Sequence, residues 1–185
     1  MKLESLNQLI ENLEKLPTIG RKSATRMAMF LIKNRYEAIK IANSIENAVV
    51  SINECENCGN LTEYELCEIC MTEREKKICI VESSKDIFIL EENKIFNGYY
   101  FVIPILENEK IEKLEDFIQK KGIKEILFAY PHSIENDAKI IYLEDRLKEY
   151  NLIFSKIAQG IPTGVKFENV DITSLTKAFQ DRVKL

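Results

Sequence analysis

The sequence predicts an α/β protein of several domains, in which a small helical domain and a cysteine-rich knob precede a parallel sheet covered by helices. Three observations predict it: helical spacing of apolar residues at the start, two C-x-x-C pairs in the middle, and alternating β-rich and helical segments from residue 78 onwards. With 185 residues, 45% of them hydrophobic and 30% charged, the chain has the composition of an ordered globular protein. We therefore expect order almost throughout.

The first domain is predicted to be helical. Apolar residues recur there every three or four positions until Pro17 ends the first helix: Leu3, Leu6, Leu9, Ile10, Leu13 and Leu16. Residues 23–33 resume helical spacing, and a third helix carries apolar residues from Ala38 to Ile52. We assign residues 1–54 to this domain and residues 55–77, which are polar and rich in cysteine, to a separate knob.

The second half of the chain alternates between strands and helices. Short apolar runs read ICIVE, YYFVIP, EILFAY and LIFSKIA, and helical segments lie between them at residues 84–92, 110–121 and 133–150. Such alternation predicts a parallel sheet with helices on both faces. We assign residues 78–158 to this sheet domain and residues 159–185 to a C-terminal segment.

Charge and apolar patterning narrow the class of protein. A net charge of −4 and a pI near 5.3 argue against a surface coated in positive charge, so any contact with nucleic acid must come from a local patch. The apolar stretches are too short to span a bilayer and no leader is expected, which predicts a cytoplasmic protein without a membrane partner. His132 is the only histidine, so a Ser-His-Asp or Cys-His site would depend on that one ring.

The cysteine knob has the spacing of a zinc site. Cys55, Cys58, Cys67 and Cys70 form the pairs CENC and CEIC, with eight residues between the pairs. Two such turns can complete the tetrahedron that zinc prefers, and four sulfur ligands leave no position open for a substrate. Two disulfides or a thioredoxin-like redox motif are the alternatives, and the spacing favours structural zinc. Cys79 stands apart in a strand pattern and is interpreted as a small buried hydrophobic residue.

The stretch LPTIGRKSATR places basic residues at the start of a helix. Lys22 and Arg26 are four residues apart and share one helix face, while Lys15 and Arg21 lie nearby. The turn that contains Gly20 can aim backbone N–H groups at a phosphate. This arrangement would bind nucleic acid without reading its sequence. The alternative is an ordinary solvated basic helix start.

Three carboxylates follow strands of the predicted sheet. Glu82 ends the run ICIVE, and Glu135 and Asp137 come just after EILFAY. Ligands of parallel sheets sit at the carboxyl ends of strands, so these acids could converge and hold Mg²⁺. The alternative is that they are surface acids or acids favoured at a helix N-terminus. No additional basic or nucleophilic residue is apparent beside them.

The order of these parts resembles the bacterial RecR family of recombination mediators over essentially the whole chain. The resemblance is carried by LPTIGRKSATRMA, the four cysteines, ICIVESSKDI, YPHSIENDAK and the closing IAQGIPTGVKFENVDITSLTKAF. It implies a helix-hairpin-helix domain, a four-cysteine zinc finger and a Toprim domain, the carboxylate-bearing fold shared with topoisomerases and primases. Residues 160–179 match a closing motif that the family associates with assembly.

The resemblance also implies a function. Members of the family are DNA-repair proteins without catalytic activity that work with RecO, and in some settings RecF, to help load RecA onto single-stranded DNA. They form homodimers or ring-shaped homotetramers that can encircle DNA. The family's basic hairpin residues fall on Lys22 and Arg26, its zinc ligands on the four cysteines of the knob, and its Toprim acids on Glu82, Glu135 and Asp137.

The sequence departs from the family pattern in three places. Thr18 stands where the hairpin usually has glycine, and the usual E-G-E of the Toprim segment is Glu135-Asn136-Asp137. A glycine-bearing loop after the second Toprim strand is reduced to ILENEKIEK, near residues 106–113. This loop lies among the family's interaction surfaces.

Two other classes of function compete with a DNA-binding mediator. A small Toprim nuclease or primase-like phosphotransferase would use Glu82, Glu135 and Asp137 to hold Mg²⁺ for attack on a phosphodiester. A purely structural zinc protein would leave Lys22 and Arg26 without a role. The mediator accounts for every segment, including the acidity, because in a ring only the inner face needs to be basic.

Overall fold

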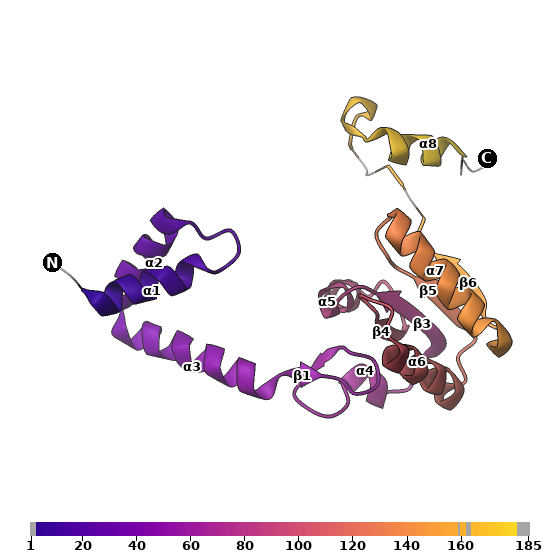
Figure 1. Cartoon of the computed structure of the whole chain (residues 1–185), viewed down its shortest axis with the longest axis horizontal. Helices are drawn as coiled ribbons and strands as arrows, with labels where there is room; N and C mark the ends of the chain where they lie inside the picture. Colours follow the sequence, from indigo (N-terminus) through magenta and orange to yellow (C-terminus); the bar gives the residue numbers. More distant parts are fainter. Residues whose placement is uncertain (1–2, 159, 162–163, 181–185) are drawn as a thin grey trace. The chain divides into compact units, whose positions relative to one another are not determined.

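The chain divides into two compact units in a computed structural model that describes residues 3–158, 160–161 and 164–180. The first unit is Met1–Ile52 and the second is Asn53–Leu185 (Figure 1). The second unit therefore contains both the cysteine knob and the sheet. The finer boundaries expected at residues 54, 77 and 158 stay predictions.

Three helices make up the first unit: α1 (Glu4–Glu14), α2 (Arg21–Lys33) and α3 (Arg35–Ser51). Its small core joins Ile10 of α1 to Ala24 and Ala28 of α2, all of which are at most 5% exposed. The two alanines lie four residues apart on one face of α2, so their small side chains let α1 pack closely. The helix begins two residues earlier than its apolar spacing predicts, and its first turn therefore includes Arg21 and Lys22.

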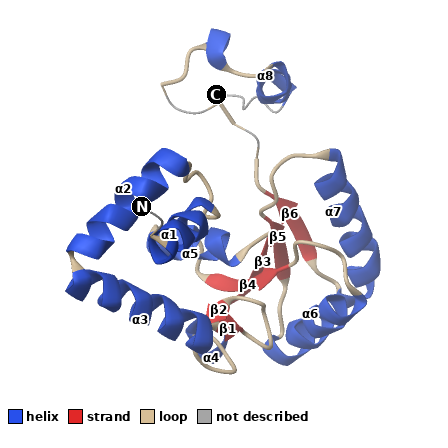
Figure 2. Cartoon of the chain, turned by 60° about the vertical axis from the view of Figure 1, so that its left-hand side comes forward, coloured by secondary structure: helices blue, strands red, loops and turns tan. Residues whose placement is uncertain are grey.

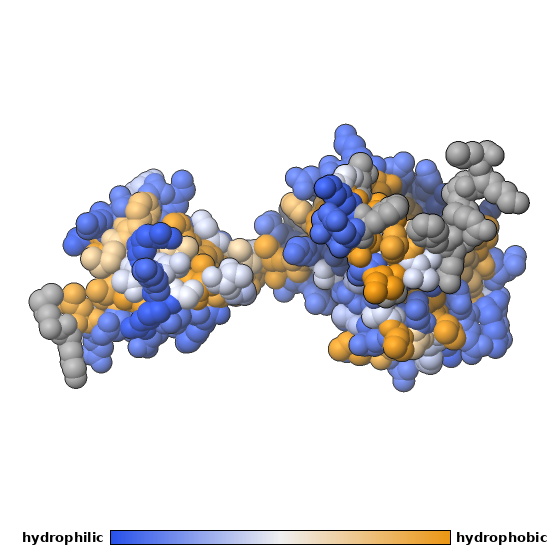
Figure 3. All heavy atoms as spheres, turned by 90° about the horizontal axis from the view of Figure 1, so that it is seen from above, coloured by the Kyte–Doolittle hydropathy of each residue, from blue (hydrophilic) through white to orange (hydrophobic). Residues whose placement is uncertain are grey.

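The apolar residues of helix α3 do not form part of the core of the first unit. None of its residues is buried, and Tyr36, Val49 and Val50 are each at least 75% exposed. Apolar surface is visible on both units in Figure 3. The helical spacing is correct, but within this chain the apolar positions of α3 remain open to solvent.

The knob opens the second unit. Strands β1 (Asn53–Glu54) and β2 (Leu61–Thr62) form an antiparallel pair, and the short helix α4 (Glu68–Met71) follows. Both ends of the loop between β1 and β2 are thereby brought together. Cys55 and Cys58 lie in this loop, Cys67 directly precedes α4 and Cys70 lies within it.

The predicted parallel sheet is confirmed. Its strands have the spatial order β4-β3-β5-β6 and all neighbouring pairs are parallel. The strands are β3 (Glu75–Val81), β4 (Gly98–Val102), β5 (Glu125–Phe128) and β6 (Ile153–Lys156). Helices cover both faces, with α5 on one side and α6 and α7 on the other (Figure 2). This arrangement follows from right-handed crossovers, because the chain moves one way across the sheet after β3 and the opposite way after β4 and β5.

The sheet helices are α5 (Ser84–Glu92), α6 (Asn108–Lys121) and α7 (Ile134–Leu147). Every residue of β4 is buried, and Tyr99 and Phe101 of that strand meet Phe117 of α6 edge to face, with ring centroids 5.3 and 6.3 Å apart. Such aromatic contacts add to the stabilisation that comes from burial alone.

One segment is more regular than expected. The sequence predicts a shortened loop near residues 106–113, but α6 begins at Asn108 and so includes most of them. The first residues of α6 are mostly charged, so the apolar spacing of the sequence does not show that the helix begins at Asn108. An exposed Lys113–Glu109 ion pair, 2.9 Å long, spans one turn of the helix there.

The remaining described elements are short. A 3₁₀ turn η1 (Lys148–Tyr150) follows α7, and η2 (Phe167–Asn169) and helix α8 (Ile172–Gln180) lie in the C-terminal segment. Residues 159, 162–163 and 181–185 of the expected assembly segment lie outside the described residues. Among the helices that are described, none is long and apolar enough to cross a membrane.

Candidate functional site

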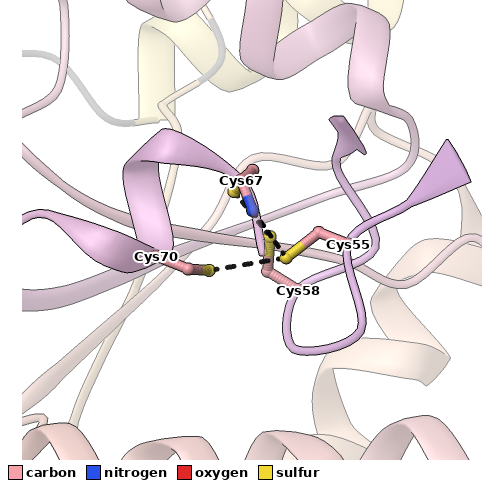
Figure 4. A group of neighbouring side chains, drawn as sticks. All are labelled: Cys55, Cys58, Cys67 and Cys70. Carbon is pink, nitrogen blue, oxygen red and sulfur yellow. Dashed lines mark hydrogen bonds between the residues drawn. The ribbon is translucent and has the colours of Figure 1, made fainter. Parts of the chain in front are cut away.

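The four cysteines of the knob converge on one point, as Figure 4 shows. Their sulfur atoms all lie within 4.8 Å of one another, with Cys58 Sγ 3.6 Å from Cys67 Sγ and Cys55 Sγ 3.8 Å from Cys70 Sγ. Zinc–sulfur bonds of about 2.3 Å in a tetrahedron place the sulfurs roughly 3.8 Å apart. The observed separations therefore fit one zinc ion, and they are far longer than the ~2.05 Å of a disulfide.

The local backbone explains why these sulfurs can meet. Gly59 has a φ of +74°, and a Cβ placed on it would come within 3.3 Å of Val102 Cβ, so the turn after Cys58 needs glycine. Cys67 lies at the start of α4, and its backbone N–H donates to Cys55 Sγ at 3.3 Å. A sulfur that accepts this bond is favoured as a thiolate, the form that binds metal.

The four cysteines are buried, and their sulfur atoms lie within hydrogen-bonding distance of one another. All four cysteines are at most 4% exposed. Hydrogen bonds from Cys58 and then the other thiols lower the pKa of Cys55 well below its ordinary value. Because four sulfurs complete the coordination of zinc, the bound metal would cross-link the knob and leave no position for a substrate.

The knob is joined to the sheet domain by hydrogen bonds to its backbone carbonyls. Val102 at the end of β4 donates its N–H to the Cys58 carbonyl at 2.8 Å, and Ser84 Oγ donates to the Gly59 carbonyl at 3.1 Å. Both contacts fall on the first ligand turn. The zinc-binding turn is therefore held against the end of β4 and the start of α5.

Lys22 and Arg26 of α2 are exposed. Within the part of the chain that the structure describes, neither makes an ion pair. They lie one helical turn apart on a face that does not include the buried Ala24 and Ala28. Both the ammonium and the guanidinium group are thus available to a ligand in solution.

The other basic residues of the hairpin have partners within it. Arg21 forms a 3.1 Å ion pair with Glu14 at the end of α1, and Lys15 Nζ donates to Asn12 at 3.0 Å. Arg21 therefore ties α2 to α1. Gly20 precedes α2 with an ordinary φ of −93°, and no side chain caps the helix start. The first N–H groups of α2 are open to a ligand.

Thr18 lies in a turn whose backbone favours glycine, the residue that the resemblance predicts at this position. Its φ is +65°, in the left-handed region, where a β-branched residue is disfavoured. The Ile19 N–H donates to the Leu16 carbonyl at 3.1 Å and closes this tight turn. The turn requires that backbone whichever residue occupies it, so Thr18 holds a strained conformation.

Positive charge is concentrated in the helical unit. Residues 1–52 contain eight lysines and arginines but five glutamates, a net charge of +3, whereas the whole chain carries −4. The second unit therefore carries the acidity. An anionic polymer would be attracted to the helical unit rather than to the chain as a whole.

The structure brings together two of the three predicted sheet acids. Glu82 lies directly after β3, and Glu135 lies in the first turn of α7, which Ser133 caps by accepting the Asn136 N–H at 3.0 Å. Both carboxylates face Lys139: its Nζ is 3.3 Å from Glu135 Oε1 and 4.0 Å from Glu82 Oε1.

Asp137 does not join the other acids. It pairs instead with Lys156 of β6, with 3.3 Å between Nζ and Oδ1. Residues two apart on a helix point in different directions, so Glu135 and Asp137 cannot face the same ligand. The structure therefore brings Glu82 and Glu135 together but not Asp137.

Sequence reasoning also missed the basic residues at these acids. No basic residue was expected beside them, yet Lys139 and Lys156 each pair with one or more. The spacing of Glu135 and Lys139, four residues apart on a helix, is a signal that could have found the first of them.

Comparisons with known proteins agree with the geometry. Residues 6–49 match the family model for the helix-hairpin-helix of RecR, and residues 52–71 match the model for the four-cysteine zinc finger domain of RecR. The matched zinc-finger range contains all four converging cysteines. The helix-hairpin-helix range contains Lys22 and Arg26.

Curated relatives match over nearly the whole chain. "Recombination protein RecR" of Campylobacter jejuni subsp. jejuni (strain 81-176) is 53% identical over 99% of this chain and 98% of its own length. The protein of the same name from a Nitratiruptor species is 46% identical over 100% and 98%. That from Helicobacter pylori (strain Shi470) is 44% identical over 95% and 93%. With its hairpin, its four-cysteine zinc finger and this full-length similarity, the chain belongs to the RecR family of recombination proteins.

Proposed function

We propose that this chain is a non-catalytic mediator of recombinational DNA repair that holds DNA through α2, without reading its sequence. The observation that carries the proposal is the placement of Lys22 in the first turn of α2, exposed and without an ion pair among the described residues. A helix dipole disfavours positive charge at that end, and no acidic residue in the turn compensates for it. A bound phosphate would do so.

Phosphate contacts explain the kind of binding expected. Lys22 and Arg26 would neutralise neighbouring phosphates, while the uncapped N–H groups at the start of α2 would donate to the same backbone. Phosphates carry no base information, so this DNA binding does not depend on the base sequence. Two cations per subunit give weak binding, which assembly of several subunits on one DNA would strengthen.

Partners and assembly form the rest of the proposal. RecO, and in some settings RecF, would act with this chain to load RecA onto single-stranded or gapped DNA in the cytoplasm. The exposed apolar positions of α3, such as Val49 and Val50, support a homodimer or a ring-shaped homotetramer in which they are covered. The acidic second unit, away from the basic hairpin in the sequence, would remain for protein partners.

The test is fluorescence anisotropy with a gapped duplex over a series of salt concentrations, with and without RecO. The variant Lys22→Ala/Arg26→Ala should bind DNA of every sequence more weakly. It should also reduce the salt slope, the steepness with which the logarithm of the binding constant falls with the logarithm of the salt concentration, by about 2, because each phosphate contact contributes about 0.9. Lys33→Ala/Arg35→Ala is the matched control. It removes the same charge where α2 ends and α3 begins, roughly 16 Å from Lys22 along α2, and should change the slope little.

The two variants separate a local grip from a general charge effect. Equal losses in both would mean that only the net charge of the helical unit matters. If the Lys22→Ala/Arg26→Ala variant binds DNA as the wild type does, the DNA site lies elsewhere on the chain and the proposal is wrong. A preference of the wild type for one base sequence would also contradict the proposal.

A further inference from the structure

Lys139 is the one buried charged side chain in the described part of the chain, with 8% of its surface exposed. It lies on α7, one turn after Glu135. A buried ammonium is costly unless oxygen atoms replace the water that it loses. The oxygen atoms around Lys139 therefore indicate which cation this position binds.

Oxygen atoms from three places in the fold surround the ammonium. Nζ donates to the Pro104 carbonyl at 2.6 Å and lies 3.3 Å from Glu135 Oε1 and 4.0 Å from Glu82 Oε1. The Tyr130 ring adds a cation–π contact, with its centroid 5.7 Å from Nζ. Glu82, Pro104 and Tyr130 follow β3, β4 and β5, which are neighbours in the sheet. The cation thus sits where the carboxyl ends of three parallel strands meet, at the edge where such sheets bind ligands.

We propose that the Lys139 ammonium occupies the cation position of this carboxylate site. Glu82 and Glu135 are therefore neutralised by a residue of the chain itself and do not bind Mg²⁺. Two carboxylates and a carbonyl are the oxygen ligands that Mg²⁺ would use. The ammonium already lies among them. A divalent ion placed between Glu82 and Glu135 would meet the like charge of the buried Lys139 ammonium at short range.

The rest of the site supports an occupied position. Tyr130 donates its hydroxyl to the Ile103 carbonyl at 2.9 Å, and burial raises the pKa of Tyr130, so the phenol stays neutral beside Glu82. Asp137, the third acid, is paired with Lys156 and turned away. The residues present therefore do not fit a magnesium centre. The edge of the sheet holds an ion cluster made of the buried Lys139, the half-buried Glu82 and the exposed Glu135, and it joins α7 to the segment after β4.

The test uses Mn²⁺ as the probe and measures, by electron paramagnetic resonance, how much of it remains free in the presence of the full-length zinc-loaded protein. The wild type and Glu82→Gln should leave equal amounts of Mn²⁺ free at millimolar metal. Lys139→Met keeps the length of the apolar stem but removes the charge. It should bind one Mn²⁺ per chain about tenfold or more tighter than the wild type does, and adding Glu82→Gln should abolish the gain.

Lys156→Met is the matched control, because it frees Asp137 while leaving Lys139 in place. It should behave as the wild type. Wild-type binding that Glu82→Gln abolishes would overturn the proposal, and so would a folded Lys139→Met variant that gains no site. Should Lys139→Met fail to fold, the comparison of the wild type with Glu82→Gln still decides, since it needs no change at Lys139.

The outcome is independent of the proposed DNA contact. Mn²⁺ binding reports on the sheet domain, whereas the salt slope reports on α2. A protein that fails one test can pass the other.

Discussion

The backbone N–H of Val102 donates a 2.8 Å hydrogen bond to the carbonyl of Cys58, so the last residue of β4 is bonded directly to a zinc-ligand turn. A Cβ placed on Gly59 would lie only 3.3 Å from Val102 Cβ. A well-ordered zinc finger therefore helps to keep the end of β4 ordered, because Cys58 and Gly59 of the zinc-finger turn both contact Val102.

Removal of zinc should loosen the end of β4. Without metal, thiols of the site take up protons and the turn around Cys58 loses its cross-link, so the Val102 amide should exchange with solvent about tenfold or more faster. Hydrogen exchange with mass spectrometry, before and after chelation, measures this. The amide of Ala24 in the helical unit is the internal control. Unchanged protection at Val102 in the metal-free protein would show that the strand does not depend on the zinc finger.

The ion pair between Arg74 and Glu91 should make stability depend on pH. Both guanidinium nitrogens donate to the carboxylate at 2.7 Å, which holds α5 to the segment before β3. The hydrogen bond from Arg74 lowers the pKa of Glu91 below its ordinary 4.5. A lowered pKa means that the stabilisation is complete above pH 4.5 and is lost as the pH falls through the pKa in the folded protein.

Glu91→Gln should therefore destabilise the protein by about 1 kcal/mol at pH 7. The difference from the wild type should shrink below pH 4.5. Urea unfolding at several pH values is the measurement. Glu109→Gln removes one partner of the Lys113 ion pair, which is fully exposed, and should change stability little at any pH. A loss in Glu91→Gln that is the same at pH 3 and pH 7 would contradict the assignment.

Most of the fold could be predicted because its signals are local. Helical spacing, strand runs and the two C-x-x-C pairs each depend on a few neighbouring residues, and the parallel sheet follows from their alternation. The exposure of α3 could not be predicted. Helical periodicity shows that Val49 and Ile45 belong to an apolar face, but it does not show whether the surface that covers this face lies in the same chain.

The sheet acids show the same limit at the scale of single side chains. Position after a strand correctly placed Glu82 and Glu135 together, since the strand ends meet at one edge of the sheet. What fills the space between them depends on the direction of each side chain along α7. One turn brings Lys139 back to Glu135, whereas Asp137, rotated by about 200°, points away.

Replacing Thr18 by glycine should stabilise the hairpin. The left-handed backbone costs an ordinary residue roughly 1–2 kcal/mol, which glycine would not incur. Glycine also has more conformational freedom in the unfolded chain, and this offsets part of the stabilisation. We expect Thr18→Gly to raise the opening free energy of the Ala24 amide by about 0.5 kcal/mol in hydrogen exchange.

Asn151→Gly is the control for this prediction. Asn151 has a similar φ of +51°, but asparagine tolerates that conformation, so the nearby Ile153 amide should gain nothing. Equal gains at both sites would show that strain at Thr18 is not the cause. A loss of protection in Thr18→Gly would show that the threonine side chain stabilises the turn.

Cys79 should behave differently from the other four cysteines toward an alkylating reagent. It is 1% exposed in the centre of β3, and burial raises its pKa to about 12, so at pH 8 only on the order of 10⁻⁴ of it is thiolate. Iodoacetamide at pH 8 should leave the zinc-loaded protein unmodified. After chelation it should label Cys55, Cys58, Cys67 and Cys70. The variant Cys79→Ala should give the same number of labels as the wild type, because Cys79 contributes none. If intact-mass measurement finds a fifth label while circular dichroism still shows the folded sheet, Cys79 is accessible and its assignment to the core is wrong.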